Sequence, residues 1–145
     1  MHPYPHRYTV MASAGPVGSV EVSADRLPNI ATAPPAEFDG PGDAWSPETL
    51  LCASVADCFI LTFRAIARAS KFEWSELSCR VEGVLERVEG VSQFTRYTTH
   101  ATLRVPSGSA QRARSLLEKA EHGCLVANSL KGERHLEAEI VGGSA

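Results

Sequence analysis

The sequence predicts an α+β domain, in which strands joined by hairpins are interrupted by helices. Two segments of alternating apolar and polar residues, 77–86 and 96–105, are typical of strands with one wet face. A long apolar run between 50 and 66 has the composition of a buried helix. A further segment, 109–122, has apolar residues at helical spacing.

The composition is that of an ordinary globular protein. The chain has 145 residues, 43% of them hydrophobic and 21% charged, so we expect a single domain, 1–145, with a core of its own. The net charge of −3 and the scattered basic residues argue against nucleic acid as a partner. Segment 1–7 has no apolar run of the kind found in signal peptides, and we expect it to be flexible.

A membrane span is not expected either. The most apolar stretch, 49–67, is interrupted by Asp57 and Arg64, whereas a membrane-spanning helix carries few or no charges. We therefore expect a cytoplasmic protein.

The N-terminal strands are expected within 8–36. Residues 8–14 and 18–24 flank the turn sequence Gly-Pro-Val-Gly at 15–18, which predicts a hairpin. A short third strand is expected near 30–34, before a loop rich in Pro, Gly and Asp.

A central helix is predicted over 47–70. Ser46 is suited to cap it, Pro47 suits its first position, and Glu48 favours the positive end of the helix dipole. Apolar residues cover nearly every face, which indicates burial beyond what one small monomer provides. These residues are Leu50, Leu51, Ala53, Val55, Ala56, Phe59, Ile60, Leu61, Phe63 and Ile66.

The remaining elements follow in order. A long hairpin over 74–105 should turn near Glu89 and Gly90. Helices are expected over 109–130, with Ser109 as the first cap and a break at Gly123. A last strand is expected over 134–141.

The four cysteines are the residues of chemical interest. Their spacing contains no C-x-x-C pair and no zinc pattern, and the absence of a secretory signal argues against a disulfide framework. Cys52 and Cys58 point about 120° apart on one helix and cannot bridge within it. Cys79 falls on the inward face of a strand, so we expect Cys52 and Cys79 to be structural.

The other two cysteines differ in their predicted surroundings. Cys124 lies at a predicted helix start, where free N–H groups favour a thiolate. Cys58 lies in an apolar helix, where burial should raise its pKa unless a cation is nearby. For either thiol the alternative is an inert buried side chain.

Two segments resemble the signatures of the OsmC/Ohr family of osmotically inducible and organic-hydroperoxide-resistance proteins. Segment 46–58, Ser-Pro-Glu-Thr-Leu-Leu-Cys-Ala-Ser-Val-Ala-Asp-Cys, resembles the family's first signature, a helix start of the form (N/S)-P-E-x-L-(x)-A-(x₃)-A-C. Segment 121–130, with Cys124, Asn128 and Ser129, is similar to its second signature, except that Leu125 replaces the usual proline. The resemblance covers nearly the whole chain.

The resemblance implies a fold and a chemistry. The expected fold is OsmC-like, with antiparallel sheets packed around the long central buried helix in an intertwined homodimer. The expected activity is reduction of organic hydroperoxides or hydrogen peroxide, with Cys58 as peroxidatic thiol and Cys124 as resolving thiol. A sulfenic acid and then a disulfide would form, and a cellular dithiol, by resemblance of lipoyl type, would restore both thiols. No metal, flavin or haem cofactor is expected.

The resemblance also implies a cation beside Cys58, an arginine held by a glutamate. Glu48 matches that glutamate, although it lies about 15 Å from Cys58 along a straight helix and could act only by orienting the arginine. The family's arginine belongs in the turn at 15–18, which contains none, and Arg26 and Arg7 are the nearest alternatives.

Without that cation, two other functions stay open. One is a noncatalytic binder of a small apolar ligand, in a pocket lined by Phe59, Phe63 and Trp45. The other is a dimeric stress protein without a small-molecule role.

Overall fold

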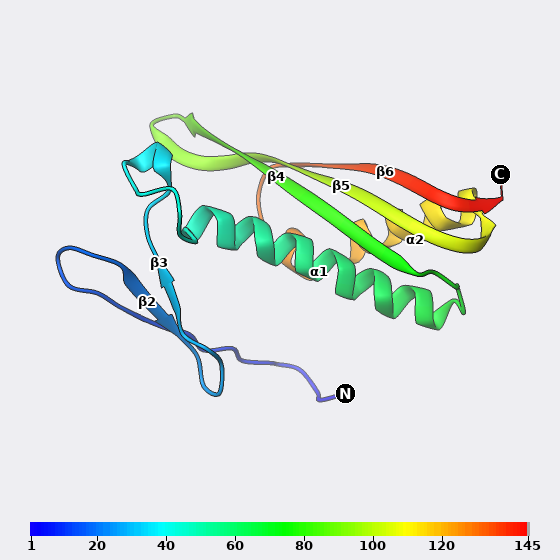
Figure 1. Cartoon of the computed structure of the whole chain (residues 1–145), viewed down its shortest axis with the longest axis horizontal. Helices are drawn as coiled ribbons and strands as arrows, with labels where there is room; N and C mark the ends of the chain where they lie inside the picture. Colours follow the sequence, from blue (N-terminus) through cyan, green and yellow to red (C-terminus); the bar gives the residue numbers. More distant parts are fainter. Residues whose placement is uncertain (145) are drawn as a thin grey trace. The chain divides into compact units, whose positions relative to one another are not determined.

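The computed structural model describes residues 1–144, which form two compact units, Met1–Leu51 and the residues from Cys52 onward (Figure 1). Helix α1, Pro47–Ala69, begins in the first unit and continues into the second. Both units contain strands and the second is rich in helix, so the predicted α+β class is confirmed. That the two units form one domain stays a prediction.

The N-terminal unit contains a three-stranded antiparallel sheet of order β1-β2-β3. Its strands are β1, Met11–Ser13, β2, Val20–Ser23, and β3, Ile30–Thr32. The β1–β2 turn includes Gly18 at φ +93°, a conformation that glycine adopts without steric cost. A short 3₁₀ turn, η1 (Ala36–Phe38), follows the sheet.

Helix α1 begins as its first residues predict. The Ser46 hydroxyl accepts a hydrogen bond from the Thr49 N–H at 3.1 Å, and the Ser46 N–H donates to the Thr49 hydroxyl at 2.9 Å. This reciprocal pairing is the capping-box arrangement, with Thr in the place of the usual Glu or Gln. It satisfies two backbone N–H groups that a helix start leaves without partners.

The larger unit is built on a second sheet, β4-β5-β6, whose strands lie side by side in Figure 1. Strands β4, Glu76–Val88, and β5, Val91–Ser109, form the predicted antiparallel hairpin. Its two-residue turn, Glu89 and Gly90, has φ of +50° and +80°, as hairpin turns of the primed type require.

The last strand departs from the expected antiparallel arrangement. Strand β6, Glu133–Ser144, pairs with β5 in parallel, with Thr99 opposite Leu136 and Leu103 opposite Ile140. The reason is the connection: α2, Ala110–Gly123, and α3, Leu125–Asn128, carry the chain back before β6 begins. Parallel strands need a crossover of this length, whereas a tight turn would have produced an antiparallel pair.

The core of the larger unit lies between its sheet and its helices. Alternate residues of β5 pack against α1 and α2, and Phe63 meets Trp74 edge to face at 5.3 Å. The buried residues of this cluster are Phe59, Phe63, Ala67, Phe72, Leu77, Ala101, Leu103, Val105, Ala113, Leu116, Leu117 and Ala120.

Helix α1 is less buried than its composition predicts. Of its 23 residues, Val55, Phe59, Phe63 and Ala67 are buried, and they recur every four positions along one stripe. Leu61, on another face, is 48% exposed. A single chain therefore covers one side of a helix that is apolar on nearly all sides.

Candidate active site: the Cys58 and Cys124 pair

The structure brings Cys58 and Cys124 together from distant parts of the sequence. Cys58 is half-buried in the middle of α1, and Cys124 is buried at the junction of α2 and α3. The Cys124 sulfur lies 3.9 Å from the carbonyl oxygen of Val55, one turn before Cys58. All four cysteines of the chain are free thiols.

The two thiols are joined by a hydrogen bond, in which the Cys124 S–H donates to the Cys58 sulfur. The Thr62 hydroxyl, one turn further along α1, lies 3.9 Å from the same sulfur. Backbone N–H groups of Leu125 and Val126 complete the donors that face Cys58. The Cys58 sulfur is thus surrounded by donors of hydrogen bonds.

These donors reverse the direction in which the pKa of Cys58 was expected to shift. Burial acts to raise the pKa, as predicted, but the Val126 N–H, the Cys124 thiol, the Thr62 hydroxyl and the Leu125 N–H outweigh it, and the pKa is lowered. The prediction that only a nearby cation could lower it was therefore wrong. Hydrogen bonds to the charged form stabilise a thiolate in the same sense as a positive charge.

The expectation for Cys124 is reversed as well. Burial raises the pKa of its thiol, with a smaller opposing effect from the Ala127 N–H. The sequence placed Cys124 correctly before a helix, but the N–H groups of Leu125 and Val126 face the sulfur of Cys58. In this pair Cys58 is the thiol that ionises more readily, and Cys124 is the neutral donor.

Cys52 and Cys79 differ from this pair in the ionisation of their thiols. Burial raises the pKa of Cys52, whose sulfur sits over strand β4, where a Cβ at Gly83 would come within 2.9 Å of it. Burial raises the pKa of Cys79 to about 11, and its thiol donates to the carbonyl oxygen of Ala56 at 3.5 Å. Both thiols are therefore poor nucleophiles at neutral pH.

The predicted activating residues lie in the N-terminal unit. Glu48 stands in the first turn of α1, and its Oε1 is buried with no hydrogen-bond partner among the described residues. Arg26 pairs with Asp25 at 3.8 Å and is 91% exposed, and Arg7 is also exposed. A cation at Cys58 supplied by Arg26 or Arg7 stays a prediction.

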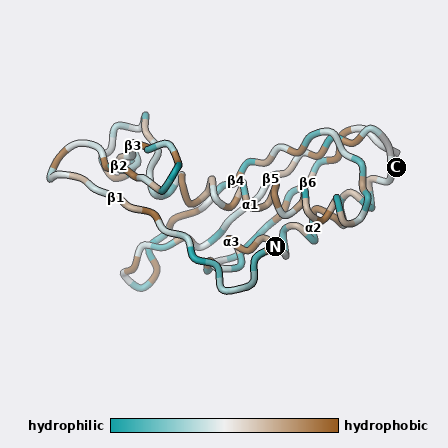
Figure 2. The backbone as a smooth tube through the Cα atoms, turned by 90° about the horizontal axis from the view of Figure 1, so that it is seen from below, coloured by the Kyte–Doolittle hydropathy of each residue, from teal (hydrophilic) through white to brown (hydrophobic). Residues whose placement is uncertain are grey.

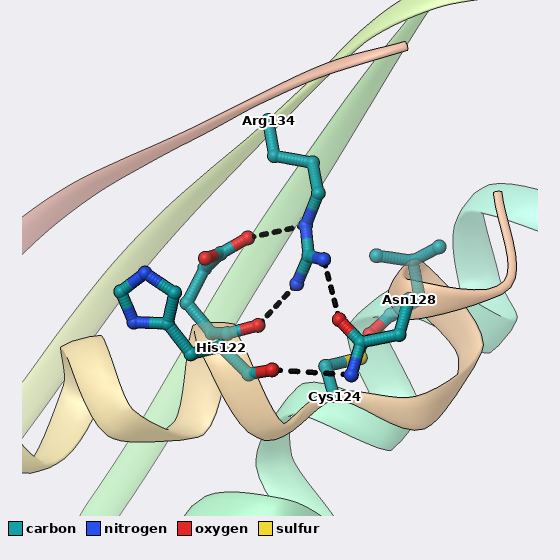
Figure 3. A network of polar contacts seen from close by, with 6 residues as sticks. His122, Cys124, Asn128 and Arg134 are labelled. Atoms are coloured by element: carbon teal, nitrogen blue, oxygen red, sulfur yellow. Dashed lines mark hydrogen bonds and ion pairs between the residues drawn. The ribbon is translucent and has the colours of Figure 1, made fainter. Parts of the chain in front are cut away.

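One arginine that the sequence did not single out lies beside the pair. Arg134, near the start of β6, donates through Nε to Glu121 Oε1 at 2.7 Å and through Nη1 to Asn128 Oδ1 at 2.6 Å (Figure 3). Its Nη2 donates to the carbonyl oxygen of Glu121. The positive charge of Arg134 also opposes the rise in the pKa of Cys124. No local motif marks this residue, because its partners belong to other elements.

The chemistry open to this site is that of thiols. Within residues 1–144, no group of three or more His, Cys, Asp or Glu side chains is arranged to hold a metal ion. Of the residues suggested to line an apolar pocket, Phe59 and Phe63 are 1% and 0% exposed and belong to the core of the larger unit. The pocket itself stays a prediction. What the arrangement provides is a readily ionised, half-buried thiol next to a protonated one.

A family model described as OsmC-like protein matches residues 40–139, which include both cysteines. The chain belongs to this family. The match spans most of the chain, and it confirms the resemblance suggested by the two cysteine segments.

The chain is also similar to other bacterial proteins. The uncharacterized protein YmaD of Bacillus subtilis (strain 168) is 28% identical over 127 residues, which are 85% of this chain and 83% of that protein. Solved OsmC structures share the fold. An organic hydroperoxide resistance protein OsmC of Legionella pneumophila matches with a TM-score of 0.74 at 24% identity, over 97% of this chain and 100% of that one.

A second solved structure is similar at lower identity. An OsmC-like protein of unknown function from Vibrio cholerae matches with a TM-score of 0.84 at 15% identity, over 92% of this chain and 99% of that one. Helix α1 is long and apolar enough to cross a membrane by length and composition, but here it contributes to the core of an OsmC-type fold.

Proposed function

We propose that this OsmC-like protein is a thiol-dependent peroxidase, which reduces organic hydroperoxides or hydrogen peroxide in oxidative-stress defence. The observation that supports it best is the hydrogen bond between the two thiols, with Cys58 as the one of lowered pKa. A thiolate is the nucleophilic form of cysteine, and a half-buried position leaves Cys58 within reach of a small substrate.

The reaction follows from the two thiols. The Cys58 thiolate attacks one oxygen of the peroxide and the O–O bond breaks. The leaving group is an alkoxide from an organic hydroperoxide or hydroxide from hydrogen peroxide, and it takes a proton to become an alcohol or water. Cys58 is then a sulfenic acid, and the Cys124 thiol condenses with it to a disulfide and water. A dithiol reductant, of lipoyl type by family resemblance, exchanges with this disulfide and is oxidised in turn.

The pKa directions favour these separate roles. The first step needs an anion at Cys58, and the lowered pKa of its thiol supplies it. Until a sulfenic acid has formed, the second thiol should stay protonated, and burial holds the pKa of Cys124 up. The organic hydroperoxide resistance described for the Legionella protein is consistent with the same substrate class.

Glu48 and an arginine are a further part of the proposal. The buried Oε1 of Glu48 has no donor within residues 1–144, and a buried carboxylate oxygen left in this way is costly. This argues that a cationic partner reaches it in the working protein. Arg26 and Arg7 are the proposed partners. The ion pair of Arg26 with Asp25 is exposed and contributes little, so it would not hold Arg26 in place.

We propose that the working protein is a cytoplasmic homodimer. The N-terminal unit exposes apolar residues instead of burying them: Met11 is 69% exposed, Ile30 38% and Phe38 53%. Figure 2 shows the hydrophobic colouring around β1. A three-stranded sheet needs an apolar face packed against something, and the exposed side of α1 needs a cover too. A second copy of the chain would supply both.

The test is consumption of an organic hydroperoxide and of hydrogen peroxide, measured with a dithiol reductant present. We expect turnover by the native protein, none by Cys58→Ser, and a single turnover ending in a sulfenic or sulfinic acid for Cys124→Ser. Mass spectrometry of the oxidised native protein should find a disulfide between Cys58 and Cys124. A native protein that consumes neither peroxide, or a Cys58→Ser variant with undiminished turnover, would refute the proposal.

A further inference from the structure

We propose that Arg134 is a positioning residue for the thiol pair: it fixes the α2–α3 corner so that Cys124 and the backbone N–H groups of Leu125 and Val126 stay directed at Cys58. This inference rests on the proposed use of Cys58 as a nucleophile, and its geometry involves residues outside the two cysteine segments. The side chain reaches its partners from strand β6, which follows the corner in the sequence.

Three contacts tie the corner to the strand. Arg134 donates to the carboxylate and to the carbonyl oxygen of Glu121, in the last turn of α2, and to the side-chain oxygen of Asn128, at the end of α3. Asn128 donates in turn to the carbonyl oxygen of His122 at 3.1 Å. Figure 3 shows Arg134, His122 and Asn128 around Cys124. One guanidinium therefore bridges the residues before and after the cysteine.

The segment held in this way is the one that supplies the donors of Cys58. Helix α3 has only four residues, Leu125–Asn128, and a helix of one turn has little stability of its own. Its backbone is anchored by the Asn128 N–H, which donates to the Cys124 carbonyl oxygen at 2.9 Å. Without the side-chain contacts of Arg134, we expect the corner to sample other conformations, in which the N–H groups of Leu125 and Val126 no longer face the sulfur.

Arginine is suited to this role by its shape. A guanidinium presents several N–H donors in one rigid plane, and here it contacts three acceptors at once. The side chains of Arg134 and Glu121 are 24% and 17% exposed, so water competes with their ion pair less than at an open surface. A lysine would keep the charge but could not make the same set of contacts.

The experiment measures the alkylation rate of Cys58 against pH in the full-length protein, by mass spectrometry of the Cys58 peptide. It needs no peroxide. We expect Arg134→Gln and Arg134→Lys to move the inflection of the Cys58 profile to higher pH. Alkylation at pH values below the inflection should be about three- to tenfold slower, since one pKa unit is a tenfold change in thiolate there. Asn128→Ala, which breaks the other side of the bridge, should shift the profile in the same direction. The double variant should shift the Cys58 profile little further than either single variant, because both changes release the same α2–α3 corner.

The matched control is Arg114→Gln. Arg114 also connects α2 to β6, by donating to the carbonyl oxygen of Ala138 at 2.8 Å, and this hydrogen bond includes no residue of α3. We expect this variant to keep the native profile of Cys58. The alkylation of Cys79, which should stay slow, reports that each variant is folded, and Asn128→Ala carries the test if the Arg134 variants do not fold.

The outcomes separate this inference from the proposed function. Unshifted Cys58 profiles in folded Arg134 and Asn128 variants would overturn the positioning role, whether or not the native protein consumes peroxide. If Arg134→Gln shifted the Cys58 profile but Arg134→Lys kept the native one, the positioning role would also be overturned. The positive charge alone would then be enough to maintain the native ionisation of Cys58. Shifted profiles in all three variants would support it, even for a native protein without peroxidase activity.

Discussion

The thiol hydrogen bond can be tested by replacing its donor with two similar side chains. Cys124→Ala removes the S–H that faces Cys58, whereas Cys124→Ser keeps a donor at the same position. Neither variant can form the disulfide. The comparison therefore separates the effect of Cys124 on ionisation of Cys58 from its effect as a resolving thiol.

The expected shift can be worked from the contact. A hydrogen bond to a charged group contributes about 1.5–3 kcal/mol. Because S–H is a weak donor and Cys58 is only half-buried, about 1 kcal/mol is the appropriate figure. One pKa unit corresponds to about 1.36 kcal/mol, so Cys124→Ala should raise the pKa of Cys58 by roughly 0.7 units. At pH values below the inflection of the profile this is about a fivefold smaller fraction of thiolate. Cys124→Ser should leave the pKa near its native value.

The assay is the alkylation rate of Cys58 between about pH 5 and pH 10, a window that brackets the ordinary range of cysteine pKa values. Each variant is compared at the inflection of its profile, because a single rate also reflects the nucleophilicity of the thiolate. Equal inflections in native protein, Cys124→Ser and Cys124→Ala would refute the reasoning, since the Cys124 thiol would then contribute nothing to the ionisation of Cys58.

Three further predictions concern the rest of the molecule. The folded-state pKa of Cys79, about 11, lies above its ordinary value of 9.0, so the unfolded chain loses this proton first as the pH rises. The free energy of unfolding should therefore fall between these two pH values, and denaturant titrations should find a smaller fall in Cys79→Ala. Gly83→Ala should destabilise the fold by about 1–3 kcal/mol in the same titrations, because the added Cβ would meet the Cys52 sulfur at 2.9 Å, and Cys52→Ala should recover part of the loss. Sedimentation should find a dimer at micromolar concentration, with more than about 1,600 Å² buried, and a monomer there would contradict the proposed assembly.

The elements of the fold were predictable where local signals decide them. Ser46 caps α1 as its position before Pro47 predicts, and Glu89 and Gly90 form the hairpin turn. These features depend on residues adjacent in the sequence. The direction of β6 was not predictable in the same way, because alternation identifies a strand but does not specify its neighbour. The crossover through α2 and α3 decides it.

The candidate site, like the fold, was predictable only where local sequence signals decide it. The sequence identified both cysteines of the pair, since each stands in a recognisable segment. It did not yield the direction of either pKa, because the donors to Cys58 come from residues 125 and 126, more than 60 positions away. Arg134 was missed for a related reason: its partners Glu121 and Asn128 lie on two helices that only the folded chain brings to the start of β6.

The activation of Cys58 and the resolution by Cys124 that we propose would both depend on one segment. The residues that lower the pKa of Cys58 include Leu125 and Val126, which directly follow the thiol proposed to close the disulfide. A displacement of this corner would therefore weaken both steps together: Cys58 would lose donors, and Cys124 would move from the sulfur it must reach. On this reasoning the three acceptors of Arg134 matter to both steps, because they hold the residues on either side of Cys124.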